Sequence, residues 1–243
     1  MRNSKQARSI AQANPEAGAN PMQGMPRSAR RARLAIRPLT PGRWRDLEDL
    51  FNARGCSVAR RCWCMYYRRS GSRGPGSSWQ MDSRTNRAQL RKLVDSGRPP
   101  GLIAYRGRVP VGWLSLGPRE DFARLERSPV MKAVDEQPVW SLICFVVPAE
   151  FRGQGVARAL LDSAIAHARK NGARLLEAYP VDRPGRSSAE SMWFGAKSMY
   201  DRAGFREVAR RKADRPIVRR QIRQSRKAGS GAFSNGRLSR RTT

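Results

Sequence analysis

The sequence has few acidic residues, one histidine and no long hydrophobic run, and each shortage excludes a class of protein. Its longest apolar run, residues 142–147, is far shorter than the ~20 residues that cross a bilayer, so we expect no membrane partner. No apolar stretch follows the first arginines, so we expect no secretory signal. A cytoplasmic protein follows, and its 4 cysteines should be reduced thiols.

The charge balance is strongly positive, because 49 Lys and Arg residues face 19 Asp and Glu residues, a net charge of +30. Such a chain attracts polyanions, which indicates a sign of partner rather than an activity. Residues 1–33 and 224–243 are basic and poor in apolar side chains, so we expect two disordered tails that bind nucleic acid nonspecifically. One folded domain, residues 34–223, remains between them.

Within this domain the apolar pattern alternates between the strand and helix periods, which predicts an α/β fold with a mixed sheet. Strands are expected at 34–39, 102–105, 109–116, 139–147, 175–181, 205–209 and 217–222; helices are expected at 41–51, 79–94, 155–170 and 189–202, and an irregular excursion at 57–78.

The most informative stretch is the junction between the apolar strand at 139–147 and the amphipathic helix at 155–170. Between them lie Arg152, Gly153, Gln154 and Gly155, then Val156 and Ala157. A helix N-terminus presents unpaired amide donors, and glycines allow a phosphate to approach the backbone closely. The junction therefore predicts a pyrophosphate site, although a turn needed only for folding would also use glycines.

In this junction the sequence resembles the GNAT superfamily, whose motif A is Arg or Gln, two residues, Gly, one residue, then Gly or Ala. Arg152, Gly155 and Ala157 match it in order. The resemblance implies the GNAT acyltransferase fold, a mixed and mostly antiparallel sheet flanked by helices, with acetyl-CoA as the co-substrate. It implies that the pantetheine arm contacts Phe145, Val146 and Val147, and that residues 152–157 hold the pyrophosphate.

A second match lies downstream, where Tyr200 precedes Gly204-Phe205 with the spacing of the same family. The resemblance implies that Tyr200 gives a proton to the departing thiolate, against the alternative of an ordinary core tyrosine. The sequence departs from the family at Trp193, where many members have an asparagine that contacts the cofactor arm.

The implied chemistry is direct attack of a primary amine on the thioester, with the oxyanion held by a strand amide, that of Val146 in our assignment. The base that deprotonates the amine is left open between Glu177, Asp182 behind it, and a water chain. The acceptor is a small-molecule or peptide amine whose identity no motif reveals. The alternative is a GNAT-fold protein without catalysis that binds nucleic acid or the ribosome; dimers are common in the family, and the oligomeric state stays open.

A cluster of thiols and aromatic side chains precedes these motifs. Cys56, Cys62 and Cys64 lie within nine residues, but the Cys-x-Cys spacing and the missing fourth ligand favour packing over zinc, so we predict no metal. By analogy with GNAT domains, whose early region shapes acceptor choice, the neighbouring aromatic and apolar side chains are candidates for the wall of an acceptor pocket; these are Trp63, Met65, Tyr66 and Tyr67.

Overall fold

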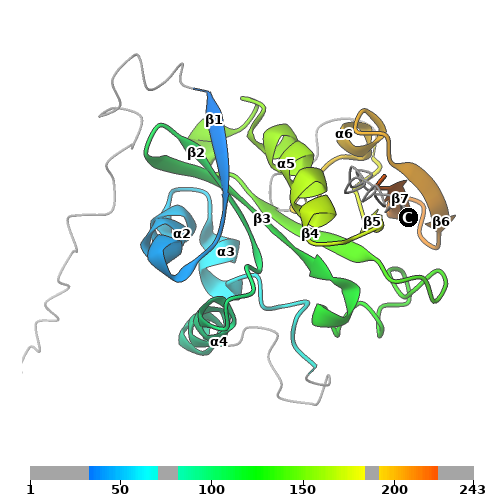
Figure 1. Cartoon of the computed structure of the whole chain (residues 1–243), viewed down its shortest axis with the longest axis horizontal. Helices are drawn as coiled ribbons and strands as arrows, with labels where there is room; N and C mark the ends of the chain where they lie inside the picture. Colours follow the sequence, from blue (N-terminus) through cyan, green and yellow to red (C-terminus); the bar gives the residue numbers. More distant parts are fainter. Residues whose placement is uncertain (1–32, 71–81, 184–191, 224–243) are drawn as a thin grey trace, which may run out of the picture.

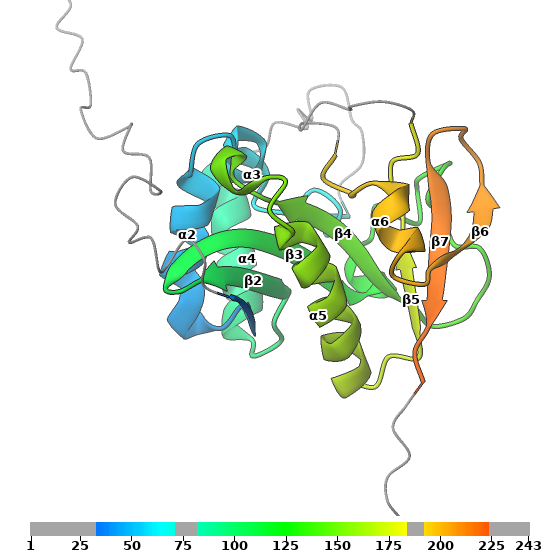
Figure 2. The same cartoon turned by 90° about the horizontal axis from the view of Figure 1, so that it is seen from above.

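The computed structural model describes residues 33–70, 82–183 and 192–223, so the predicted tails lie outside the described residues except for Arg33. The described part is a seven-stranded sheet in the order β1-β2-β3-β4-β5-β7-β6, with helices on both faces (Figures 1 and 2). Its strands are β1 (Leu34–Pro38), β2 (Gly101–Arg106), β3 (Val109–Pro118), β4 (Trp140–Val146), β5 (Leu175–Ala178), β6 (Arg206–Arg210) and β7 (Pro216–Gln221). Its helices are α2 (Trp44–Asn52), α3 (Ser57–Cys62), α4 (Ser83–Asp95), α5 (Val156–Lys170) and α6 (Lys197–Asp201), with single 3-10 turns η1 (Pro41–Arg43), η2 (Arg119–Asp121) and η3 (Ala149–Phe151).

The pairing of the strands confirms the predicted mixed, mostly antiparallel sheet. Among the described strands only β4 and β5 are parallel neighbours, and the pairs β1–β2, β2–β3, β3–β4, β5–β7 and β6–β7 are antiparallel. The predicted hairpin around Arg106-Gly107-Arg108 is the β2–β3 connection.

Helix α5 packs on one face of the sheet, together with α6, as Figure 2 shows. Its predicted apolar stripe is buried throughout, from Val156 to Ala168. The first turn of α5 lies directly on β3 at Gly112, where an added Cβ would come within 2.5 Å of Val156 Cγ1. This close approach fixes where the helix begins relative to the sheet.

Helices α2, α3 and α4 cover the opposite face over β2 and β3, where Phe51, Trp63 and Trp113 form the centre of a second core (Figure 1). No helix among the described residues is both long enough and apolar enough to cross a membrane.

Several predicted elements have different bounds in the structure, and the strand expected at 175–181 ends at Ala178. The stretch expected to be irregular contains α3, and the helix expected from residue 79 begins at Ser83, because the Asp82 carboxylate accepts a hydrogen bond from the Arg84 amide at 3.0 Å. Residues 79–81 lie outside the described residues. The helix expected at 189–202 is the short α6 in the described part, because Gly195 has a left-handed backbone (φ +75°).

Candidate functional site

Strands β4 and β5 run side by side only at their beginnings. Their parallel pairing covers Trp140 to Leu142 of β4, and β4 continues to Val146 without β5 beside it. The register against β3 shifts between Ser115 and Leu116, which leaves Ile143 as an extra residue in β4. Such a bulge bends a strand and increases its twist. The second half of β4 therefore has a backbone edge that β5 does not pair.

Phe145 presents its amide at this edge. The Phe145 N–H donates to the carbonyl oxygen of Trp193 at 2.6 Å. Because successive residues of a strand direct their backbone groups to opposite edges, the amide of Val146 faces β3, which pairs with it at Trp113. The oxyanion assignment to Val146 is therefore corrected: the amide at the open edge is that of Phe145.

The segment that begins at Trp193 lies between β4 and the chain beyond β5. The Val181 amide donates to Gly195 O at 2.9 Å, and the Lys197 amide donates to Val181 O at 2.9 Å. On its other side the segment accepts the Phe145 amide through Trp193. It thus fills the gap between the diverging strands, and a ligand carbonyl that uses the Phe145 amide must replace the carbonyl of Trp193.

The glycine-bearing turn before α5 has the geometry of an anion site. Gly153 (φ +73°) and Gly155 (φ +79°) are both left-handed, which favours glycine, and an added Cβ at either would meet nothing within 4 Å. Gly155 is the N-cap residue and supplies no side-chain hydrogen bond, so the first amides of α5 lack a capping partner from it. Arg152 anchors the turn, since its guanidinium donates to Val147 O at 3.0 Å and Gly55 O at 3.1 Å.

The other residues of the turn divide between backbone and side-chain roles. Val156 is buried against the core and Ala157 packs partly against it, so only their amides can face a ligand. The side chain of Gln154 donates to Glu150 O and accepts from Arg106 Nη1. The turn is therefore held by its own side chains while its amides stay available.

Arg106 is a member of this site that the sequence analysis missed. Its side chain comes from the end of β2 and is only 8% exposed, and its Nε is buried without a hydrogen-bond partner among the described residues. A buried cation beside an uncapped helix N-terminus suits a phosphate group. In the sequence it looked like a charge in a hairpin turn, because only the β2–β3 pairing brings it to residue 154.

Tyr200 lies next to Phe145 at the same edge of β4. Its ring is fully buried and contacts the ring of Phe145 with centroids 6.4 Å apart, and its hydroxyl donates to Phe194 O at 2.9 Å. Burial raises the pKa of Tyr200, with a further contribution from Cys144 nearby. The phenol is therefore protonated at neutral pH, as a proton donor must be.

Glu177 does not have the surroundings of a general base. It is fully buried, its Oε1 accepts from Arg119 Nη1 at 2.7 Å and from Tyr179 Oη at 2.6 Å, and its Oε2 accepts from Arg219 Nε at 2.8 Å. Two guanidinium groups and a phenol thus occupy both oxygens of this buried carboxylate, which leaves it no access to a substrate proton. Its side chain is the centre of an internal ion-pair network, which speaks against the predicted role.

Asp182, the second candidate base, pairs with Arg210 Nη2 at 2.7 Å. Among the described residues, no carboxylate that the sequence analysis named for this role is therefore free. A water chain is the alternative that remains from that analysis.

The four side chains expected to line an acceptor pocket separate into two groups. Trp63 and Met65 are buried in the core beneath α2 and α4. Tyr66 and Tyr67 instead form a row of edge-to-face rings with Phe194, at centroid distances of 4.9 Å and 5.5 Å. This row lies on the face of the sheet opposite α5. The row lies next to the Phe145 edge, because Phe194 directly follows Trp193, whose carbonyl accepts the Phe145 amide.

The cysteines are buried or half-buried. Cys56 and Cys64 are buried, and Cys64 Sγ accepts a hydrogen bond from Trp113 Nε1 at 3.2 Å. Burial raises the pKa of Cys56 to about 11 and that of Cys62 to about 11. Throughout the described ranges, no group of three or more His, Cys, Asp or Glu side chains is placed to hold a metal ion.

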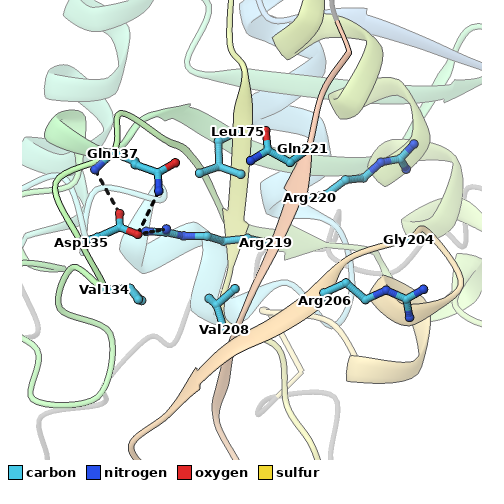
Figure 3. A pocket seen from close by; sticks show the side chains of 10 residues that line it. All are labelled: Val134, Asp135, Gln137, Leu175, Gly204, Arg206, Val208, Arg219, Arg220 and Gln221. Atoms are coloured by element: carbon cyan, nitrogen blue, oxygen red, sulfur yellow. Dashed lines mark hydrogen bonds and ion pairs between the residues drawn. The ribbon is translucent and has the colours of Figure 1, made fainter.

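A separate groove of about 570 Å³ lies among β5, β6, β7 and residues 134–137 (Figure 3). It begins at Leu175, at the amino end of β5, whereas the glycine turn follows the carboxyl end of the parallel strand β4. Figure 3 shows Arg219 extending to Asp135, which places this side of the groove in the Glu177 network. The groove is therefore remote from the glycine turn.

Comparison with family models identifies the family of this chain. A model of the acetyltransferase (GNAT) family matches residues 60–205. Similar solved structures include an N-acetyltransferase from Staphylococcus aureus Mu50, with 14% identity, a TM-score of 0.46 and coverage of 79% of this chain and 100% of the other. The PaiA N-acetyltransferase from Thermoplasma acidophilum, in complex with coenzyme A, has 16% identity, a TM-score of 0.44 and coverage of 78% and 99%.

A third similar structure is the ribosomal-protein-alanine N-acetyltransferase from Brucella melitensis, with 20% identity, a TM-score of 0.45 and coverage of 77% of this chain and 99% of the other. The search of curated proteins gave no significant match.

Proposed function

The chain belongs to the GNAT acetyltransferase family, and we propose that it transfers the acetyl group of acetyl-CoA to a primary amine by direct attack. The observation that carries the proposal is the junction of β4 and α5. Two left-handed glycines with open space around them precede an uncapped helix N-terminus, next to a strand whose edge β5 leaves unpaired. In this proposal the folded domain of residues 34–223 is the complete catalytic unit.

In the proposed complex the amides of residues 153–157 bind the pyrophosphate, and Arg106 adds a buried cation beside them. The edge of β4 receives the pantetheine arm, and the Phe145 amide, released from Trp193, donates to the thioester oxygen. Once the Trp193 carbonyl has left, this donor is held in place by the strand, so it stabilises the oxyanion without further movement.

Tyr200 then protonates the thiolate of coenzyme A as the carbon–sulfur bond breaks. Its buried ring contacts that of Phe145, and its hydroxyl keeps its proton because its pKa is raised. The amine loses its proton to water in this proposal, because Glu177 and Asp182 are both held by arginines.

Calorimetric titration of the full chain with acetyl-CoA tests the binding step. We expect saturable binding at moderate salt, and we expect Gly155→Trp to abolish it, because the new side chain occupies the open space above the helix N-terminus. Gly172→Trp is the matched control: Gly172 has a similar left-handed backbone (φ +82°) and open surroundings, but it lies at the other end of α5. Equal binding by both variants would refute the assignment of the turn.

The alternative of a protein that binds nucleic acid without catalysis has two observations in its favour. Trp193 already occupies the Phe145 amide, and the chain carries a net charge of +30. The two functions respond differently to salt, since nucleic-acid binding falls steeply with ionic strength and transfer to a small amine does not. Binding to a random duplex, measured over a salt series beside the acetyl-CoA titration, separates them.

A further inference from the structure

Two partly buried arginines flank the row of rings formed by Tyr66, Tyr67 and Phe194. The Arg124 guanidinium lies 4.2 Å from the centroid of Tyr66, and that of Arg215 lies 4.8 Å from the centroid of Phe194. Within the part of the chain that the structure describes, neither guanidinium forms an ion pair. The Nε of Arg124 is buried and has no hydrogen-bond partner there.

The other buried arginines of this face all have carboxylate partners. Arg68 pairs with Asp121 at 3.3 Å, and Arg119 and Arg219 share Glu177. Removing a guanidinium from water is costly, and an anion or several hydrogen bonds normally compensate. On this face, the arginines that connect parts of the fold each have a carboxylate partner. Arg124 and Arg215 differ from them because they have none among the described residues.

Arg215 has few local means of satisfying its charge. One nitrogen, Nη1, donates to Tyr179 O at 3.2 Å, and the adjacent carboxylate of Asp214 pairs with Arg183 at 2.6 Å and with Lys212 at 3.5 Å rather than with Arg215. Burial lowers the pKa of Arg215, the direction expected of a cation that lacks a full counter-charge. The contact with Phe194 compensates only part of this cost.

Arg215 is also close to the proposed reaction centre. Phe194, which it covers, accepts the Tyr200 hydroxyl through its carbonyl oxygen, and the preceding residue, Trp193, accepts the Phe145 amide. The rings lie on the face of the sheet opposite α5 and the glycine turn. An acceptor that lies against this row therefore approaches the β4 edge from the side that the phosphates leave free.

From this arrangement, and resting on the proposed acetyl transfer, we propose that the acceptor is a primary amine that also carries a carboxylate, and that Arg215 binds this carboxylate. The planar guanidinium offers two parallel donors that match a carboxylate, and one such group neutralises one arginine. Arg124 and Arg215 lie against the two end rings of a row of three, so we assign one small anion to one arginine rather than to both.

Acetyl transfer to matched acids and amides tests this inference. The full chain is supplied with acetyl-CoA and each of the common amino acids, several dipeptides and their carboxamides, with phosphoethanolamine beside ethanolamine; thiol release is followed and products are confirmed by mass. We expect at least one carboxylate acceptor whose kcat/KM exceeds that of its amide about tenfold or more. Free amino acids and dipeptides distinguish the two sources of the carboxylate.

Replacement of Arg215 tests whether it is the group that binds the acceptor carboxylate. We expect Arg215→Gln to raise KM for the acid about ten- to hundredfold and to bring the ratio of kcat/KM for the acid to that for the amide close to one. Arg215→Lys should give values between those of the wild type and Arg215→Gln. Arg211→Gln is the matched control, because Arg211 lies in the same hairpin but donates only to exposed carbonyls, among them Lys132 O. It should leave both acceptors unchanged.

The failures are distinguishable. If calorimetry shows that acetyl-CoA does not bind, the proposed function fails and this inference fails with it. If acetyl-CoA binds but amides are used as well as acids, if only the phosphate-bearing amine is used, or if no carboxylate-bearing amine is acetylated, this inference alone is overturned. An acid preference that survives in Arg215→Gln overturns the role of Arg215.

Discussion

Two neighbouring groups of side chains on the face opposite α5 use arginine in opposite ways. Around Glu177, Arg119 and Arg219 are each bonded to the buried carboxylate, and each also pairs with an outer carboxylate, Glu126 or Asp135. In the row of rings, Arg124 and Arg215 have aromatic partners and no ion pair among the described residues. The residue type is shared, so the partners decide which group holds the fold and which is ready for a ligand.

The paired group connects parts of the chain that are distant in sequence. Through Arg119 and Asp135 it fastens the connection between β3 and β4 onto β5 and β7. Such a network contributes to a single arrangement of the fold, and removing one member leaves its buried neighbours with incomplete partners. The unpaired group has no comparable connection to lose.

The largest effect that would test this comparison is expected from Glu177→Gln. Loss of the central charge leaves Arg119 and Arg219 with only their outer carboxylates, so we expect the free energy of unfolding to fall by about 3–5 kcal/mol. Chemical denaturation of the full chain measures it. A variant that keeps its stability but loses acetyl transfer would instead restore Glu177 as the general base.

A smaller effect is expected from the two buried tyrosines on either side of Phe194. Tyr200→Phe removes the proposed proton donor, so we expect about hundredfold slower transfer, with acetyl-CoA affinity kept.

Tyr179→Phe removes a hydroxyl that bonds Arg119, Glu177 and Ser141, so we expect a loss of about 1–3 kcal/mol in the free energy of unfolding.

The pH profile sharpens the contrast between these tyrosines. Because the pKa of Tyr200 is raised, its proton is present throughout the neutral and mildly alkaline range, so the rate should not fall there through loss of this acid. A decline of the wild-type rate near pH 8 that Tyr200→Phe abolishes would contradict the raised pKa. Equal rates for Tyr200→Phe and the wild type would remove the acid role altogether.

The smallest effect on the stability of the protein is expected from replacing the unpaired arginines. Arg124→Gln and Arg215→Gln break no ion pair within the described ranges, so we expect each to change the free energy of unfolding by less than about 1 kcal/mol. The same denaturation series measures this. A loss as large as that of Glu177→Gln would show that these arginines are structural and would end the contrast.

Patterns between neighbouring residues in the sequence were sufficient to predict much of the fold and the glycine turn of the candidate site. The apolar stripe of α5 and the continuous apolar strand before it were readable because their periodicity is local, and Gly153 and Gly155 mark a turn that needs left-handed residues. The short α6 was not readable, because Gly195 and the bridge from Val181 to Ala196 interrupt an otherwise helical pattern.

The sequence by itself determined the α/β class, the order of most elements, the glycine turn before α5 and the family. Tertiary structure alone decided the rest of the site: the open edge at Phe145, the carbonyl of Trp193 upon it, Arg106 beside the turn, and the partners of each arginine. The physical reason is the distance along the chain over which the deciding interactions act. Backbone conformation and amphipathic pattern depend on neighbours in the chain, whereas the state of a charged side chain depends on which distant group the sheet brings beside it, as Glu177 does for Arg119 and Arg219 but no described carboxylate does for Arg215.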